Sequence, residues 1–344
     1  MSLVKRLSAR LQNHPKRLVY AEGSDPRVLQ AARQFATKKL GVPFLVGDKE
    51  EIERTAHSID VRLDGMKIIQ PELADDFEDM AKTFNGMPKF RGYEPETARE
   101  LLKKSGYYAT MMLMTGRADA VVIGATIASS SSLRQIFQIV PLQKSIKTAS
   151  SMMVLASDSE ELGINGDLFM ADCGVIPNPT EEQLSDIAVT TATLVNHLTL
   201  EKPKVAMLAY CSKSSATVDP NVLKMKAATA LAHEKAMAQG LDIDIDGELQ
   251  VDAALRPVVA ELKGINSSVA GRANILIFPD LNSGNTAYKL VQITSDVKCY
   301  GQIMTGLTKP VAEISRGASV DDIFGTSVIV AAQAVDRKFY SFEE

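Results

Sequence analysis

The chain has 344 residues, of which 45% are hydrophobic and 23% are charged, and it carries a net charge of −4. This composition is ordinary for a globular protein, and the length predicts two domains or one large α/β unit. A weakly acidic chain has no electrostatic reason to hold nucleic acid or an anionic membrane. A polyanionic ligand must therefore be caught locally, by a few cations and backbone amides.

Cysteine and histidine spacing argues against metal and disulfide chemistry. The three cysteines, Cys173, Cys211 and Cys299, lie far apart and form no CxxC pair, and the four histidines show no metal-ligand spacing. We therefore predict neither a disulfide framework nor a bound metal. The sequence also contains no signal-peptide pattern and no apolar run of transmembrane length, so we predict a cytoplasmic protein.

Short apolar runs alternate with longer amphipathic stretches along the chain. The first predicted strand covers residues 17–22. After it, Ser24, Asp25 and Pro26 offer an N-cap and a first-turn proline for a helix over 27–39. Further strands are predicted at 42–46, 120–123, 205–209 and 275–278, and further helices at 96–102, 180–193 and 222–239. This alternation predicts mostly parallel sheets flanked by helices on both faces, with ligands beyond the carboxyl ends of the strands.

Loops of small, hydroxyl-bearing and amide-bearing residues follow three of these strands, at 124–134, 210–215 and 279–285. Such loops let a ligand approach the backbone closely. In the first loop, four serines at 129–132 precede Leu133 and Arg134. They could bind a phosphate through amides at a helix N-terminus, hydroxyls and one guanidinium. The alternative is a serine-rich N-cap, with Arg134 paired to a nearby carboxylate.

A fourth polar segment, at 315–322, combines a hydroxyl, a guanidinium and two carboxylates. Asp322 lies seven residues after Ser315, so on one continuous helix the two would share a face. The carboxylate could then accept a proton from a thiol that the site acidifies. The alternative is structural: Ser315 caps a helix, Arg316 is solvated, and Asp321 and Asp322 favour the positive helix end.

Common catalytic motifs are absent. The sequence has no GxGxxG after a strand, no GxxxxGK[ST] and no GxSxG, which argues against a dinucleotide dehydrogenase, a P-loop enzyme and an α/β-hydrolase. Cys173 and Cys211 are possible nucleophiles, but lone cysteines at strand ends are more often small buried residues. Tyr288 could line a pocket or simply pack.

Five segments between residues 118 and 323 together resemble the phosphate acetyltransferase (phosphotransacetylase) family, which also includes phosphate butyryltransferases. The segments read ADAVVIGATIASSSSLRQIFQIV, MADCGVIPNPTEEQLSDIAV, IDGELQVDAAL, SVAGRANILIFPDLNSGNTAYKLVQ and GQIMTGLTKPVAEISRGASVDDI. The stretches FPDLNSGNTAYK and SRGASVDDI are the specific ones, because we know of no other family that carries both in this order.

The resemblance implies a two-domain α/β fold similar to isopropylmalate dehydrogenase, with the active-site cleft between the domains, and a homodimer. We expect a discontinuous first domain, residues 1–147 and 302–344, and an inserted second domain, residues 148–301. The basic, polar stretch 143–151 is our candidate for one crossing between them, and the stretch 300–306 is our candidate for the return crossing.

The implied reaction is reversible: acetyl phosphate and coenzyme A give acetyl-CoA and phosphate. Coenzyme A is a co-substrate, and no permanently bound cofactor or metal is required. By resemblance, Asp322 is the general base for the thiol, and Arg316 interacts with that aspartate and with substrate. Ser315 stabilises the tetrahedral intermediate. The residues expected to bind substrate are Arg134, Ser129, Ser131, Asn282, Gly284, Asn285 and Tyr288.

The sequence departs from the family pattern at two positions where an arginine is usual, which are Ile293 and a site near Pro88. An apolar residue cannot replace a phosphate-binding guanidinium. Two alternatives therefore stay open. One is an enzyme of the phosphate butyryltransferase kind that acts on another acyl group, and the other is a non-catalytic acyl-CoA-binding or regulatory domain.

Overall fold

The computed structural model describes residues 2–213 and 218–335, so Ser214 and Ser215 of the predicted 210–215 loop lie outside the described residues. The chain groups into two compact units. The N-terminal unit consists mainly of Val4–Pro141 and the described part of Leu307–Glu344, and the central unit consists mainly of Leu142–Gly306. The chain passes between them after Pro141 and after Gly306, whereas the sequence suggested 147/148 and 301/302.

The N-terminal unit contains a parallel sheet in the order β3-β2-β1-β4-β11. Its strands are β1 (Lys16–Tyr20), β2 (Gly41–Val46), β3 (Lys67–Ile69), β4 (Ala120–Ile123) and β11 (Val311–Glu313). Its helices are α1 (Leu3–Asn13), α2 (Pro26–Thr37), α3 (Lys49–Ser58), the 3₁₀ turn η1 (Pro71–Leu73), α4 (Phe77–Gly86), α5 (Pro95–Leu102), α6 (Ser105–Met114), α7 (Ser129–Ile139) and α13 (Val320–Gln333).

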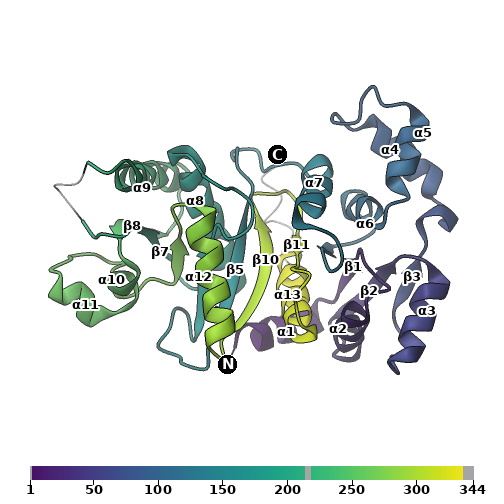
Figure 1. The fold of residues 1–344 in the computed structure, drawn as a ribbon, viewed down its shortest axis with the longest axis horizontal. Helices are drawn as coiled ribbons and strands as arrows, with labels where there is room; N and C mark the ends of the chain where they lie inside the picture. Colours follow the sequence, from purple (N-terminus) through teal and green to yellow (C-terminus); the bar gives the residue numbers. More distant parts are fainter. Residues whose placement is uncertain (1, 214–217, 336–344) are drawn as a thin grey trace. The chain divides into compact units, whose positions relative to one another are not determined.

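Helices cover both faces of this sheet (Figure 1). The Tyr20 hydroxyl donates to Ser327 Oγ of α13 at 2.9 Å, so Tyr20 and its register partner Val122 face α13. The next residue, Ile123, faces the other side, where its side chain would meet a Cβ added to Gly106 of α6. Helix α2 packs against α13, and α7 packs against α6. The two helix pairs therefore lie on opposite faces, as the sequence predicted.

The central unit contains strands in the order β10-β5-β6-β9-β7-β8, of which β6, β9, β7 and β8 are parallel and β10, β5 and β6 antiparallel. Its strands are β5 (Ser150–Ala156), β6 (Asp167–Ala171), β7 (Lys204–Leu208), β8 (Asp244–Leu249), β9 (Ile275–Ile277) and β10 (Lys298–Thr305). Its helices are α8 (Glu181–Thr199), α9 (Pro220–Ala238), α10 (Val251–Leu255), α11 (Pro257–Leu262) and α12 (Leu281–Thr294).

One apolar cluster of the central unit joins residues of β5, β6, β7 and β9 to α10, α11 and α12. It includes no residue of α8 or α9, which pack against each other. Helix α8 also packs against β6, β7 and β9, and α9 packs against β7 and β8. The stretch 300–306, our candidate for the return crossing, is mostly strand β10 and ends at Gly306, after which the chain returns to the N-terminal unit. One expectation needs correction here. The end of the predicted 279–285 loop is the first turn of α12, because the Asp280 carboxylate caps it by accepting from Ser283 N at 2.8 Å.

The start of α2 agrees with the sequence prediction. Asp25 is its N-cap and accepts from the backbone amides of Arg27 and Val28, and Pro26 occupies the first helical position. Such a cap satisfies amides that the helix itself cannot. Within the described residues, every helix is too short or too polar to cross a membrane.

Candidate functional site

The carboxyl ends of β1, β4 and β11 lie next to one another in the N-terminal unit, because β4 pairs with both β1 and β11. The chain runs from β1 to β2 on one side, whereas β4 pairs on the other side of β1. The strand order therefore reverses between β1 and β4, which is where open α/β sheets bind ligands. The side of the sheet where these strands have their carboxyl ends is called the sheet edge below. The segments that follow the strands there carry six of the predicted site residues, which are Ser129, Ser131, Arg134, Ser315, Arg316 and Asp322.

Helix α7 presents its first turn at this edge. Ser129, Ser131 and Arg134 are exposed, whereas Ser132 is buried and its hydroxyl bonds the Ser129 carbonyl and the Glu313 carboxylate at 3.0 and 3.1 Å. The N-cap is Ala128, which has no polar side chain, so none of the serines caps the helix. An uncapped helix N-terminus with exposed hydroxyls can bind an anion.

Arg134 forms no ion pair with any carboxylate among the described residues, contrary to the alternative in which it pairs with a nearby carboxylate. The positive charge of Arg134 affects the pKa of Tyr107 of α6. Burial raises the pKa of the Tyr107 hydroxyl, and the Arg134 guanidinium opposes that rise. The hydroxyl lies 2.6 Å from Gln138 Oε1. Arg134 is therefore an exposed cation available to an anionic ligand.

The 315–322 segment is not one continuous helix, which corrects the shared-face argument. A turn closes from the Ala318 amide to the Ser315 carbonyl at 2.9 Å, and α13 begins only at Val320. Ser319, not Ser315, is the N-cap. Its hydroxyl accepts from Asp322 N at 3.1 Å, and the Asp322 carboxylate accepts from Ser319 N at 3.0 Å. The capping box therefore fixes the orientation of the predicted base.

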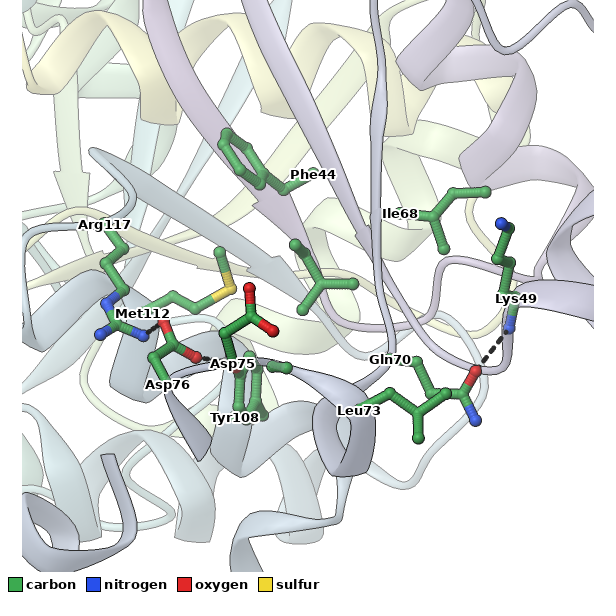
Figure 2. A pocket seen from close by; sticks show the side chains of 12 residues that line it. Phe44, Lys49, Ile68, Gln70, Leu73, Asp75, Asp76, Tyr108, Met112 and Arg117 are labelled. Atoms are coloured by element: carbon green, nitrogen blue, oxygen red, sulfur yellow. Dashed lines mark hydrogen bonds and ion pairs between the residues drawn. The ribbon is translucent and has the colours of Figure 1, made fainter. Parts of the chain in front are cut away.

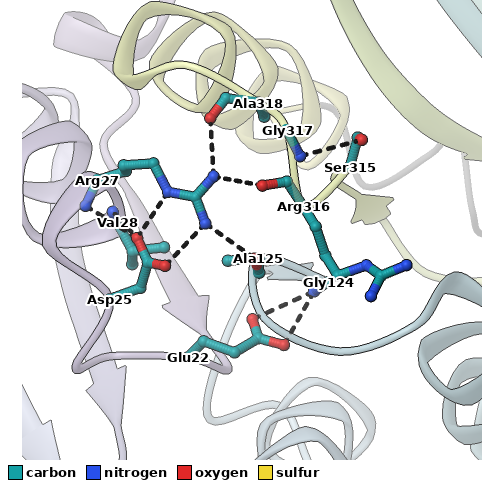
Figure 3. Close-up of polar contacts among 10 residues, drawn as sticks. All are labelled: Glu22, Asp25, Arg27, Val28, Gly124, Ala125, Ser315, Arg316, Gly317 and Ala318. Atoms are coloured by element: carbon teal, nitrogen blue, oxygen red, sulfur yellow. Dashed lines mark hydrogen bonds and ion pairs between the residues drawn. The ribbon is translucent and has the colours of Figure 1, made fainter.

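Ser315 and Arg316 are both exposed, and the Ser315 hydroxyl accepts a bond from Gly317 N at 3.3 Å. The Arg316 guanidinium points away from the neighbouring polar cluster (Figure 3). In the described part of the chain it forms no ion pair with Asp322. Arg316 is thus a second cation at the edge, beside a hydroxyl and an oriented carboxylate.

Glu22 and Arg27, which the sequence patterns did not single out, lie at the same edge (Figure 3). The Glu22 carboxylate accepts from Gly124 N at 3.0 and 3.1 Å. Burial raises its pKa to about 7, with smaller contributions from Asp25 and Glu313, while bonds from the amides of Gly124 and Ala125 oppose the rise. The signal in the sequence was the polar run 22–27 directly after a buried strand.

In the central unit, the predicted residues of α12 have different environments. Asn282 is exposed. Gly284 is buried so closely that an added Cβ would meet the Asp172 carbonyl at 2.4 Å, and Asn285 Nδ2 donates to the Cys173 carbonyl at 3.0 Å. Tyr288 is only 4% exposed and belongs to the apolar cluster, which supports the packing alternative. Of these four residues, Asn282 is the most exposed to solvent.

The cysteine environments argue against an activated thiolate. Burial raises the pKa of the Cys173 thiol, and the nearby Asp172 charge adds to the rise. Burial also raises the pKa of the Cys211 thiol. A reactive cysteine needs the opposite shift.

The two departures from the family pattern lie on the surface. Ile293 of α12 is 81% exposed, and Pro88 is exposed between α4 and α5. Beside Pro88, the Lys89 ammonium donates to the Phe137 carbonyl of α7, and Arg91 is exposed. Two cations therefore lie next to the position where the family usually has an arginine.

A separate cavity of about 590 Å³ lies in the N-terminal unit (Figure 2). Phe44, Ile68, Leu73 and Met112 supply apolar walls. On its polar side, Asp76 pairs with Arg117 and accepts from the Tyr108 hydroxyl at 2.9 Å. The cavity contains none of the predicted site residues.

Comparison with known proteins covers nearly the whole chain. The family model described as "Phosphate acetyl/butaryl transferase" matches residues 2–331. A phosphate acetyltransferase of Acetivibrio thermocellus is 41% identical over 334 residues, which is 97% of this chain and 98% of that protein.

Two solved structures extend the match to the fold. A phosphotransacetylase from Streptococcus pyogenes matches with a TM-score of 0.87 and 33% identity, covering 97% of this chain and 98% of that one. The EutD phosphotransacetylase from Staphylococcus aureus matches with a TM-score of 0.86 and 32% identity, covering 96% and 98%.

Proposed function

The chain belongs to the phosphate acetyl/butyryl transferase family, and from this premise we propose that it transfers an acetyl group reversibly between phosphate and the thiol of coenzyme A. The observation that carries the proposal is the match over residues 2–331, because it spans all the polar segments that follow β4, β9 and β11. The relatives at 32–41% identity over at least 93% of the chain are named phosphate acetyltransferases, so acetyl is the acyl group.

In the proposed reaction, the coenzyme A sulfur attacks the carbonyl carbon of acetyl phosphate. The S–C bond forms and the thiol proton moves to the Asp322 carboxylate. The bond between the acetyl carbon and the bridging oxygen then breaks, and that oxygen leaves with phosphorus as inorganic phosphate. The bond from Ser319 N occupies one of the roughly four lone-pair directions of the carboxylate, which leaves room for the proton. Nearby guanidinium groups lower the pKa of the thiol and so make this transfer feasible.

The developing negative charge needs fixed donors. We assign the Ser315 hydroxyl and Arg316 to the oxyanion of the tetrahedral intermediate, and Arg134, Ser129 and Ser131 to the phosphate. Their support is that all five side chains are exposed at one sheet edge.

Helix α12 is assigned to substrate binding through Asn282. Gly284, Asn285 and Tyr288 act with it by fixing the segment that carries the exposed amide. We also propose that the protein is a homodimer and that it is located in the cytoplasm. The cytoplasmic assignment is supported by the three free cysteines, which suit a reducing compartment, and the dimer by the family resemblance.

The test is thioester formation from coenzyme A and acetyl, propionyl or butyryl phosphate. We expect the acetyl compound to give the highest kcat/KM. A higher kcat/KM for butyryl phosphate would show that butyryl, not acetyl, is the preferred acyl group. No turnover with any of the three would contradict the enzyme assignment.

The same assay tests the base. Asp322→Asn keeps an acceptor for Ser319 N but cannot take the thiol proton, so we expect kcat to fall by about 10²–10⁴-fold, as for loss of a general base. Asp321→Asn is the matched control, since it removes the same charge from the same helix end. Equal activity in the two variants would reject Asp322 as the base.

A further inference from the structure

Arg27 of α2 joins the two polar loops of the N-terminal unit (Figure 3). Its Nη1 donates to the carbonyls of Arg316 and Ala318 at 2.6 and 3.0 Å. Its Nη2 donates to the Ala125 carbonyl at 2.9 Å. One guanidinium thus links the loop after β11 to the loop after β4, although these loops are nearly two hundred residues apart in the sequence.

Asp25 holds this guanidinium in place. Its Oδ1 accepts from Arg27 Nε at 3.1 Å and its Oδ2 accepts from Nη2 at 2.8 Å, which is a two-point contact. The Asp25 side chain is 8% exposed and that of Arg27 is 29% exposed. Burial alone would raise the pKa of Asp25, but the bonds from Arg27 hold that pKa below its usual range. The pair is therefore charged, oriented and largely shielded from solvent.

The joined loops carry the groups assigned to the reaction. The loop after β4 leads into Ser129 and Arg134, and the loop after β11 contains Ser315 and Arg316 and leads into Asp322. A guanidinium presents its donors in a fixed plane, so it can bind three carbonyls and a carboxylate at once. A lysine ammonium cannot reproduce that fork.

We propose that Arg27 is a positioning residue for acyl transfer, which holds the loop after β4 and the loop after β11 in a fixed position relative to each other. This inference rests on the proposed function. Arg27 supplies no proton and contacts no reacting atom. It acts by fixing the backbone that holds Ser315, Arg316 and Asp322, so its loss removes preorganised stabilisation of the transition state.

The kinetic test compares Arg27→Ala and Arg27→Lys with the wild type. We expect kcat to fall by roughly 10²-fold in Arg27→Ala, since a misplacement of about 1 Å at a reacting centre costs that much, with a much smaller change in KM. Added guanidinium chloride, below denaturing concentration, should restore part of kcat, whereas methylammonium should not. If Arg27→Ala does not fold, Arg27→Lys replaces it in the kinetic comparison. Its kcat should fall because an ammonium cannot reproduce the fork, and a wild-type kcat in Arg27→Lys would overturn the inference.

Arg33→Ala is the matched control. Arg33 also lies on α2 and also donates to two loop carbonyls, those of Arg62 and Asp64, at 3.0 and 2.8 Å. That loop carries no assigned residue, so kcat should stay at the wild-type value. Equal losses in the Arg33 and Arg27 variants, or loss of Arg27 activity without guanidinium rescue, would overturn the inference.

Amide hydrogen exchange tests the link without an activity readout. In Arg27→Ala we expect faster exchange in segments 124–128 and 315–319 and no change in 62–66. Unchanged exchange would overturn the inference even if the wild type transfers acetyl groups. A wild type without transferase activity but with the expected exchange would instead contradict the proposed function and leave the loop link established.

Discussion

At the scale of single residues, Glu22 has the most unusual electrostatic environment at the sheet edge. Its carboxyl is desolvated and near two other carboxylates, those of Asp25 and Glu313, so its pKa rises from 4.5 to about 7. Between these values the folded chain keeps a proton that the unfolded chain has released. This group's contribution to stability is therefore complete below about pH 4.5 and is lost as the pH rises to about 7.

Glu22→Gln should remove this dependence, because the amide oxygen can still accept from Gly124 N but does not titrate. A shift of this size corresponds to about 3 kcal/mol. We expect the free energy of unfolding of the variant, relative to the wild type, to increase by up to that amount from about pH 5 to about pH 8. Urea unfolding across this range measures it, with the exposed Glu201→Gln as control. Parallel curves for wild type and Glu22→Gln would contradict the assigned pKa.

The types of residue at the site could be predicted from sequence, but their contacts could not. Ser129, Arg134, Ser315 and Asp322 stood out because polar residues follow apolar strands. Their roles came from the family resemblance and stay predictions. The spacing argument for Ser315 and Asp322 was wrong, because it assumed one helix where the chain makes a turn before α13.

At the scale of elements, the apolar runs of β1, β2, β4, β7 and β9 were predicted as strands, whereas β5 and β6 were missed although both are apolar and buried. Strand β4 matches its predicted bounds, and β2, β7 and β9 differ by one residue at one or both ends. Strand β8 was missed because its sequence, DIDGEL, alternates acidic and apolar residues. Among the described residues it pairs only with β7, as the outermost strand of its sheet, so solvated side chains are tolerated there.

Helix α12 offers a test of packing at this scale. An alanine Cβ at Gly284 would meet the Asp172 carbonyl at 2.4 Å and the Phe278 Cβ at 3.4 Å, so the helix must move. We expect Gly284→Ala to lower the free energy of unfolding by about 1–3 kcal/mol, as overpacking does.

Gly86→Ala in α4 is the control for that variant, because no described atom beyond its chain neighbours and its own helix backbone lies within 4 Å of its added Cβ. Alanine is the better helix former, so the control should be unchanged or slightly stabilised. Urea unfolding followed by circular dichroism compares the two. A Gly284→Ala protein as stable as its control would show that α12 does not depend on this close approach.

At the scale of the whole molecule, the net charge of −4 is unfavourable for a ligand as negative as coenzyme A or acetyl phosphate. The N-terminal unit compensates locally, since Arg134 and Arg316 are exposed and have no carboxylate partner in the described part of the chain. Low salt extends both the repulsion from the net charge and the attraction to Arg134 and Arg316, so the two oppose each other and binding should change only moderately with salt.

The central claim is that the thiol of coenzyme A attacks acetyl phosphate directly, without an acyl-enzyme. The most direct measurement is the exchange of labelled inorganic phosphate into acetyl phosphate. We predict rapid exchange when coenzyme A is present and none when it is absent, since neither cysteine with a raised pKa is an activated nucleophile. Exchange without coenzyme A would reveal an acyl-enzyme, and no exchange under either condition would contradict acetyl transfer by this chain.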